Sequence, residues 1–256
     1  MSDRCLCDRL TMRKGLGVNP VAGALTAVVL GGVVVGGTVL AFHSTSPKPP
    51  LMVVDGVAAS ATGIPGVTKT AELKLESYPD SAPITWRRTN DGVGPHPGWV
   101  SYGPTTNIQL PANTLVTVTI TNYDGGEPIP NPGYLASVHG TVGGDMTIDG
   151  EKATSIDPSH VGHTFTIHNY PSDTQESLYV SVPIPAVPDD LMENPPAEPS
   201  ASNPYGWPPK VVKFQFVTKG PGEYAWNCEF PCGGNYAGMG EAMSSYGYMS
   251  GVIHVV

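Results

Sequence analysis

Basic residues are few in this sequence, and it shows no basic patch. Lys and Arg number 13 against 22 Asp and Glu, which gives a formal net charge of −9 at pH 7. A protein that follows nucleic-acid phosphates needs a basic patch to neutralise them. The composition therefore argues against nucleic-acid binding, whereas an acidic surface suits solubility or docking to a basic partner.

The local motifs of common enzyme classes are also missing. The sequence contains no G-x-S-x-G, no H-E-x-x-H and no glycine loop of the kind that cradles phosphates. Hydrolytic and phosphate chemistry therefore have no recognisable residues here. We expect no catalytic activity from this chain alone, although the chain would suit a subunit of an enzyme complex.

Charge is absent altogether from residues 21–42. As a helix, this 22-residue run would be about 33 Å long, enough to cross a hydrocarbon core of roughly 30 Å. Four basic residues precede it, so the positive-inside rule leaves residues 1–20 in the cytoplasm. The alternative is a cleaved signal peptide, but its apolar run would be shorter. The sequence thus predicts a single transmembrane helix in the cell membrane, followed by an extracytoplasmic domain.

Glycine (31 residues) and proline (27 residues) are abundant, and they alternate with β-branched and aromatic runs. This pattern favours a loop-rich all-β fold over disorder. Short alternating segments separated by turn signals predict a Greek-key β-sandwich. The predicted strands are 71–78, 113–123, 163–170, 177–184, 211–218, 222–228 and 251–256.

The exported part divides into two regions in this interpretation. Residues 43–104 are a tether and N-terminal extension, and residues 105–256 are the folded domain. Within that domain, residues 183–209 are rich in proline, which lacks a backbone donor and cannot sit in a central strand. We therefore expect a long excursion across the surface there.

Soft metal ligands gather near the C-terminus. Cys228 and Cys232 are the only cysteines after the predicted anchor, and Met239, Met243 and Met249 follow them. Thiolate, thioether and imidazole are ligands for soft and borderline metal ions, so these residues with a histidine could form a metal site. In an exported domain, the two cysteines could instead form a disulfide, and the methionines could fill a core.

Three segments of the chain resemble the cupredoxin family. GEYAWNC at 222–228 resembles the strand that delivers the copper-binding cysteine, and MSGVIHV at 249–255 resembles the axial methionine with the last strand. VGHTFTI at 161–167 resembles the upstream segment and puts His163 in the ligand position. The resemblance covers roughly residues 105–256. It implies a cupredoxin β-sandwich with copper as cofactor.

The C-terminal loop also resembles the dinuclear CuA motif, C-x3-C-x3-H-x2-M, of cytochrome c oxidase subunit II and nitrous oxide reductase. Cys228, Cys232 and Met239 match the motif, but Tyr236 stands where the motif has its second histidine. A phenol is a poor copper ligand at neutral pH because its pKa is about 10. We therefore expect one copper ion or none. Register with the last strand favours Met249 as the axial ligand, and motif spacing favours Met239.

Other histidines are candidates to replace the missing ligand. These are His139, His160 and His168. His168 lies five residues after His163 on the same predicted strand and should therefore face the opposite side of the sheet.

Two hypotheses follow. The first is a membrane-anchored, extracytoplasmic cupredoxin that binds copper through His163, Cys228, Cys232 and Met249 or Met239. It would transfer electrons or carry copper, with a redox partner protein or as the subunit II of an oxidase-like membrane complex. The second is a metal-free structural or assembly subunit of a membrane respiratory complex, with a Cys228–Cys232 disulfide. Copper content separates the two.

Overall fold

The chain divides into two units, Met1–Ser46 and Pro47–Val256. The computed structural model describes residues 28–29, 31–35, 48–59, 61–80, 99–126, 133–170, 172, 174–235, 238–239 and 241–256. In the first unit, the described residues are helical and exposed. The predicted cytoplasmic segment and most of the predicted anchor lie outside the described residues. Among the residues that are described, no helix is long and apolar enough to span a membrane.

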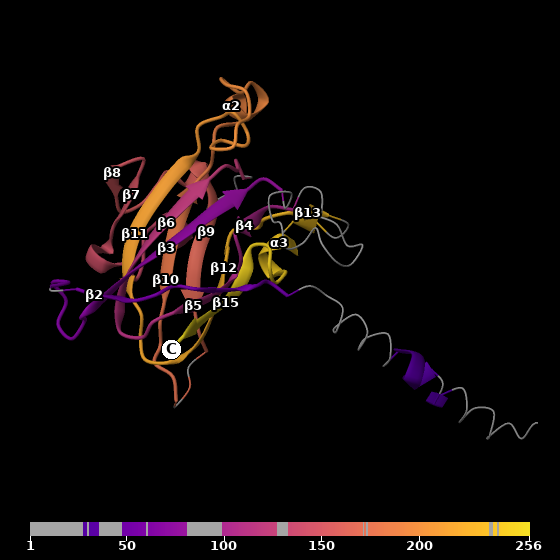
Figure 1. Ribbon diagram of the computed structural model, residues 1–256. Coiled ribbons are helices and arrows are strands. Elements are labelled where there is room, and N and C mark those ends of the chain that lie inside the picture. Colours follow the sequence, from indigo (N-terminus) through magenta and orange to yellow (C-terminus); the bar gives the residue numbers. More distant parts are fainter. Residues whose placement is uncertain are drawn as a thin grey trace, which may run out of the picture. The chain divides into compact units, whose positions relative to one another are not determined.

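The second unit is built from two β-sheets (Figure 1). The first sheet contains, in spatial order, β1 (Leu51–Val53), β5 (Asn107–Leu110), β15 (Ser250–Val255), β12 (Gly222–Asn227), β9 (Val161–His168) and β10 (Val180–Pro185). The second contains β2 (Val57–Ala58), β3 (Lys69–Tyr78), β6 (Thr114–Asn122), β11 (Lys210–Val217), β7 (Met146–Ile148) and β8 (Glu151–Ala153), with β4 (Ser101–Gly103) paired to β3. Along the described strands, the chain passes from one sheet to the other six times, at β1/β2, β4/β5, β5/β6, β8/β9, β10/β11 and β11/β12. The predicted all-β fold with two sheets is confirmed.

Short elements complete the unit. They are the helices α2 (Asp189–Glu193) and α3 (Glu241–Ser244), the 3-10 turns η2 (Gly133–Ala136), η3 (Val142–Gly144) and η4 (Pro158–His160), and a two-stranded sheet of β13 (Gly234–Asn235) and β14 (Gly238–Met239). None of the described helices in this unit exceeds five residues. The sandwich is therefore held together by its sheets.

Each of the seven predicted strands coincides with an observed one. They correspond to β3, β6, β9, β10, β11, β12 and β15, with bounds that differ by up to three residues. β10 contains Pro183 and Pro185, the first prolines of the proline-rich segment. It lies at the edge of its sheet, where a missing backbone donor is tolerated.

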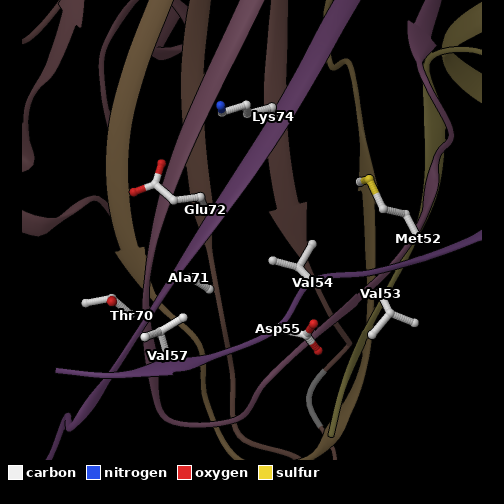
Figure 2. Close-up of a pocket in the computed structure, with 9 residues that line it drawn as sticks. All are labelled: Met52, Val53, Val54, Asp55, Val57, Thr70, Ala71, Glu72 and Lys74. Carbon is white, nitrogen blue, oxygen red and sulfur yellow. The ribbon is translucent and has the colours of Figure 1, made fainter.

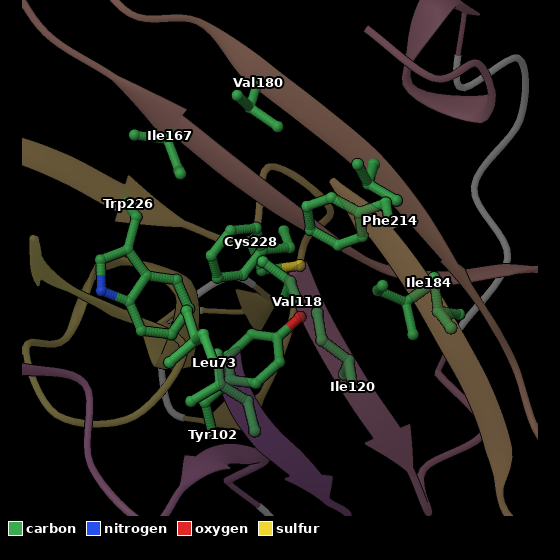
Figure 3. Packing of buried hydrophobic residues seen from close by; sticks show 14 of the residues in the cluster. Leu73, Tyr102, Val118, Ile120, Ile167, Val180, Ile184, Phe214, Trp226 and Cys228 are labelled. Carbon is green, nitrogen blue, oxygen red and sulfur yellow. The ribbon is translucent and has the colours of Figure 1, made fainter. Parts of the chain in front are cut away.

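One apolar core fills the space between the sheets. Leu73 and Val118 from the second sheet and Ile167 and Trp226 from the first belong to it, and each is fully buried (Figure 3). Burying a large apolar side chain contributes roughly 1.5–3 kcal/mol, so these alternating positions account for the fold. Cys228 belongs to the same cluster, which brings the core up to the predicted metal site.

Residues upstream of position 105 take part in both sheets. β1 pairs in parallel with β5, and β3 pairs in parallel with β6 along most of its length. The described part of the region expected to be a tether and extension, 43–104, therefore supplies strands to the same sandwich as residues 105–256. β1, β2 and β4 have two or three residues each, too few to show a hydrophobic alternation in the sequence.

Candidate metal centre

Three buried side chains from distant parts of the sequence converge where β9 begins and β12 ends. They are His163, Cys228 and Cys232. Nδ1 of His163 is 3.0 Å from Sγ of Cys232 and 3.9 Å from Sγ of Cys228, and the two sulfur atoms are 2.9 Å apart. Both cysteines are free thiols, and each of the three residues is at most 3% exposed. The structure thus brings together three of the five predicted ligands.

Strand pairing explains why His163 and Cys228 meet. β9 and β12 are antiparallel neighbours with Thr166 opposite Asn227, so the residue after β12 lies beside the first half of β9. Side chains alternate along β9, which puts His163 on the same face as Phe165, a member of the apolar core. The histidine ring therefore points inward, toward the sulfur atoms.

Main-chain groups surround the two sulfur atoms. The N–H of Thr164 donates to Sγ of Cys228 over 3.3 Å, and the N–H of Cys228 donates to the carbonyl oxygen of Met249 over 2.8 Å. The carbonyl oxygen of Phe230 lies 3.2 Å from Sγ of Cys228 and 2.9 Å from Sγ of Cys232. An N–H group aimed at sulfur stabilises a thiolate, whereas a carbonyl can only accept from a thiol.

A carboxylate completes the surroundings of the histidine. Oδ2 of Asp124 is 2.8 Å from Nε2 of His163 and accepts its N–H, so the ring presents Nδ1 to the two sulfur atoms. The Asp124 side chain is largely buried. Sequence analysis missed this residue. It lies 39 positions upstream of His163, at the start of a loop, and a single Asp there carries no spacing that points to a site.

The electrostatics of the protein groups favour a charge pair between His163 and Cys228. Burial opposes the imidazolium form of His163, but hydrogen bonds to Asp124 and Cys228 outweigh it and raise the pKa of His163 to about 10. Burial also opposes the thiolate of Cys228, yet hydrogen bonds from Cys232 and His163 lower its pKa to about 5. Burial and the adjacent Cys228 raise the pKa of Cys232 well above its ordinary value. At neutral pH the site therefore holds one thiolate, one thiol and one imidazolium.

The donor set fits a soft or borderline metal ion. The ligand atoms of the three residues all lie within 4.8 Å of one another. A metal ion with bonds of about 2.0–2.3 Å reaches ligand atoms up to roughly twice that distance apart. Thiolate and imidazole together suit copper or zinc. Within the described residues, this is the one group of three or more His, Cys, Asp or Glu side chains arranged to hold a metal ion.

The predicted methionine ligands and Tyr236 differ in how much of each the structure describes. Met249 directly precedes β15, is fully buried, and binds the N–H of Cys228 through its carbonyl oxygen. The main chain of Met239 belongs to β14, but its side chain lies outside the described residues, as does Tyr236. Met243 is half-buried and packs against the core. Of the two candidate axial ligands, Met249 is thus the one whose main chain is hydrogen-bonded to Cys228.

The other candidate histidines have other partners. His139 packs edge-on against the ring of Tyr134, and His160 ends η4 and is exposed. His168 is half-buried and bonds to an asparagine side chain. As far as the described residues go, none of the three joins the group formed by His163 and the two cysteines.

A groove of about 400 Å³ lies between the segment from β1 to β2 and strand β3 (Figure 2). Its lining mixes apolar side chains such as Val54 and Ala71 with the charged side chains of Asp55, Glu72 and Lys74. It contains no cysteine or histidine, and none of its lining residues belongs to the metal-ligand group. This groove is therefore separate from the group formed by His163 and the two cysteines.

Comparisons with known proteins find only distant likenesses. No family model matches the chain, and no curated protein matches it. Among solved structures, the chain is similar to auracyanin B, with a TM-score of 0.31 and 14% identity over 82% of this chain and 99% of that one. It is also similar to the copper protein rusticyanin, with a TM-score of 0.30 and 14% identity over 73% and 78%. Such low TM-scores and sequence identities assign no activity, so the function must be inferred from the site itself.

Proposed function

We propose that the Pro47–Val256 unit is a cupredoxin-like electron-transfer domain that binds one copper ion through His163, Cys228 and Cys232. The observation that carries this proposal is the buried group of two sulfur atoms and one imidazole nitrogen, all within 4.8 Å of one another. A copper ion that alternates between Cu(I) and Cu(II) needs thiolate for the soft state and imidazole for both states. The three side chains supply that combination.

The rigidity of the ligand positions favours electron transfer over copper delivery. His163 belongs to β9, and Cys228 is hydrogen-bonded to the main chain at both its N–H and its Sγ. A histidine on a paired strand and a cysteine hydrogen-bonded directly after the neighbouring strand should move little when the charge of the metal changes. A copper carrier must also pass its ion to a partner, which calls for accessible ligands, whereas these three are at most 3% exposed.

Met249 is our choice for the axial ligand, and Met239 is the alternative. The Met249 carbonyl accepts the N–H of Cys228 over 2.8 Å, so the two residues are adjacent through the main chain. With Tyr236 in the position of the second CuA histidine, we propose a single copper ion. A dinuclear centre would lack a ligand.

Membrane attachment and a redox partner belong to the same proposal. The uncharged run at 21–42 would anchor the unit outside the cell membrane, with residues 1–20 in the cytoplasm. A redox protein or an oxidase-like membrane complex would exchange electrons with the copper. Protease added to intact cells should remove the C-terminal unit, and protection until the membrane is opened would contradict this orientation.

Metal analysis of the full-length chain, purified in detergent under reducing conditions, tests the copper site. We expect about one copper per chain, a visible thiolate-to-Cu(II) absorption band after oxidation, and an electron spin resonance signal of a single Cu(II). Stoichiometric zinc without copper would overturn the proposal, because zinc has no redox chemistry. The multiline spectrum of a mixed-valent copper pair would overturn the single-ion assignment.

A metal-free structural or assembly subunit with a Cys228–Cys232 disulfide is the second candidate. The observation in its favour is the 2.9 Å separation of the two sulfur atoms, which would need only a small movement to bond. Thiol titration of the denatured chain, prepared without reductant, distinguishes it. Loss of these two thiols together with the absence of metal would support the disulfide and end the copper proposal.

A further inference from the structure

Both ends of the proline-rich segment 183–209 form hydrogen bonds to the main chain of Tyr123 and Asp124. At its start, the N–H of Val187 donates to the carbonyl oxygen of Asp124 over 3.0 Å. At its end, Nε1 of Trp207 donates to the carbonyl oxygen of Tyr123 over 2.9 Å. Two consecutive carbonyl groups are thus held by residues twenty positions apart.

The side chain of Asn122, two residues before Asp124, also holds this stretch through hydrogen bonds. Its Nδ2 donates to the carbonyl oxygens of Asp124 over 2.7 Å and Pro185 over 3.0 Å. Its Oδ1 accepts the N–H of Asp124 over 3.1 Å. Asn122 is fully buried at the end of β6, so it links Asp124 to the edge strand from which the proline-rich segment departs.

Aromatic packing adds to these hydrogen bonds. The ring of Tyr205 lies 4.9 Å from that of Trp207 and 5.4 Å from that of Tyr123, and Tyr123 in turn stacks on Tyr78 at 6.0 Å. Such ring pairs contribute about 0.5–1.5 kcal/mol each beyond their burial. The end of the proline-rich segment is therefore packed against the sandwich rather than lying free on its surface.

The loop after Asp124 lies directly on the residue before His163. A Cβ at Gly126, whose φ is +79°, would lie 2.6 Å from Cα of Gly162. A Cβ at Gly162 would lie 2.5 Å from the carbonyl oxygen of Gly125. Only glycine permits this approach, and the approach brings the Asp124 carboxylate to Nε2 of His163.

We propose that the proline-rich segment 183–209 clamps Tyr123 and Asp124 at both of its ends, and that Asp124 is the positioning residue for His163. The clamp fixes the carboxylate, the carboxylate holds Nε2–H, and Nδ1 is thereby left facing Cys228 and Cys232. The segment is a structural support of the metal centre, although it supplies no ligand itself.

A consequence for copper rests on the proposed function. A fixed carboxylate bonded to the histidine ligand adds negative charge beside the metal ion and stabilises Cu(II) relative to Cu(I). Replacing ligand-bonded groups of this kind typically changes metal affinity by about 10–100-fold. If Asp124→Asn weakens Cu(II) by that factor relative to Cu(I), the reduction potential rises by about 59–118 mV, at about 59 mV per tenfold.

The clamp can be tested without metal. In the full-length, metal-free protein with isotope-labelled histidine, magnetic resonance would follow solvent exchange of the Nε2 proton of His163. Trp207→Phe keeps a ring and removes the N–H donor, and we expect exchange to become about tenfold faster, the upper range for one lost hydrogen bond. Tyr205→Phe is the matched control, because its buried hydroxyl has no hydrogen-bond partner among the described residues. Equal exchange in the wild type and Trp207→Phe would overturn the clamp.

The copper-loaded protein provides the second measurement. We expect a higher reduction potential in Asp124→Asn and a smaller rise in Trp207→Phe. Asp190→Asn should leave the potential unchanged, since it removes an exposed carboxylate from the same segment without touching His163. An equal shift in Asp190→Asn and Asp124→Asn would mean a general charge effect and would overturn the positioning role. A wild type that binds no copper would overturn the proposed function, while the proton-exchange result would still decide the clamp.

Discussion

The contact between Gly162 and the loop that carries Asp124 leaves no room for a side chain. A Cβ at Gly162 would lie 2.5 Å from the carbonyl oxygen of Gly125 and 3.1 Å from Cα of Ala186, whereas ordinary contact begins at 3.4 Å. Both obstacles are main-chain atoms, so neither can rotate away. Gly162→Ala must therefore push the start of β9 and the loop apart by most of an ångström.

Forced overpacking of this kind typically destabilises a protein by about 1–3 kcal/mol, and we expect a loss of that size in the free energy of unfolding. Gly220→Ala is the matched control. The single atom within 4 Å of its Cβ is Oε2 of Glu176 at 3.2 Å, the end of a flexible side chain. That variant should change the free energy of unfolding by no more than about 0.5 kcal/mol.

Urea unfolding followed by tryptophan fluorescence measures both variants, because Trp226 is fully buried in the core. A lower midpoint with an unchanged slope would report a true loss of stability in Gly162→Ala. The same variant should also speed exchange of the His163 Nε2 proton, since the loop that carries Asp124 must move. If Gly162→Ala is no less stable than Gly220→Ala, the close approach of loop and strand is wrong.

Three further predictions concern the site itself. Cys228→Ser should abolish copper binding, whereas Cys232→Ser should leave a weaker single-copper site; equal, purely structural effects of both changes in a metal-free protein would instead indicate a disulfide. Met249→Leu should shift the visible spectrum and the reduction potential, and Met239→Leu should not; the reverse result would make Met239 the axial ligand. In the metal-free protein, the stability of the wild type should rise from about pH 5 to 6.5, stay level to about pH 9 and then fall. The reason is that the pKa of Cys228 is lowered from 9.0 to about 5 and that of His163 is raised from 6.5 to about 10, so the two proton changes on folding cancel between 6.5 and 9.0. Chemical denaturation across pH would check this, and in Cys228→Ser the level region should give way to a decline above about pH 6.5.

The sequence predicted the strands that present the ligands because their signal is local. β9, β12 and β15 show a period-two alternation, and neighbouring antiparallel strands then bring His163 to Cys228. Cys232 lies four residues beyond Cys228, in the loop after β12, so its contact with His163 depends on the loop rather than on strand register. The sequence excluded the prolines from a central strand, and β10, which contains Pro183 and Pro185, indeed lies at a sheet edge.

What the sequence could not predict depends on contacts between loops. Asp124 reaches His163 across 39 positions, and its place is fixed by Asn122, Val187 and Gly162, none of which forms a recognisable motif with it. The proline-rich segment was correctly expected to avoid central strands. Its docking through Trp207 was not expected, because an aromatic residue between prolines is equally compatible with an exposed loop.

Metal binding must displace protons from this site, and their number distinguishes the possible ligand sets. At pH 7 the metal-free site carries a proton on Cys232, whose pKa is raised by burial and by Cys228, and one on each ring nitrogen of His163, whose pKa is about 10. If both sulfur atoms and Nδ1 held Cu(I), Cys232 and Nδ1 of His163 would each lose a proton, while Nε2 of His163 would keep its proton in the hydrogen bond to Asp124. We therefore expect two protons released per Cu(I), and an affinity that rises by about a hundredfold per pH unit near neutrality. Calorimetric titration in buffers of different ionisation enthalpy counts the protons directly. Release of a single proton would remove either Cys232 or His163 from the ligand set, and Cys232→Ser and His163→Ala would show which one.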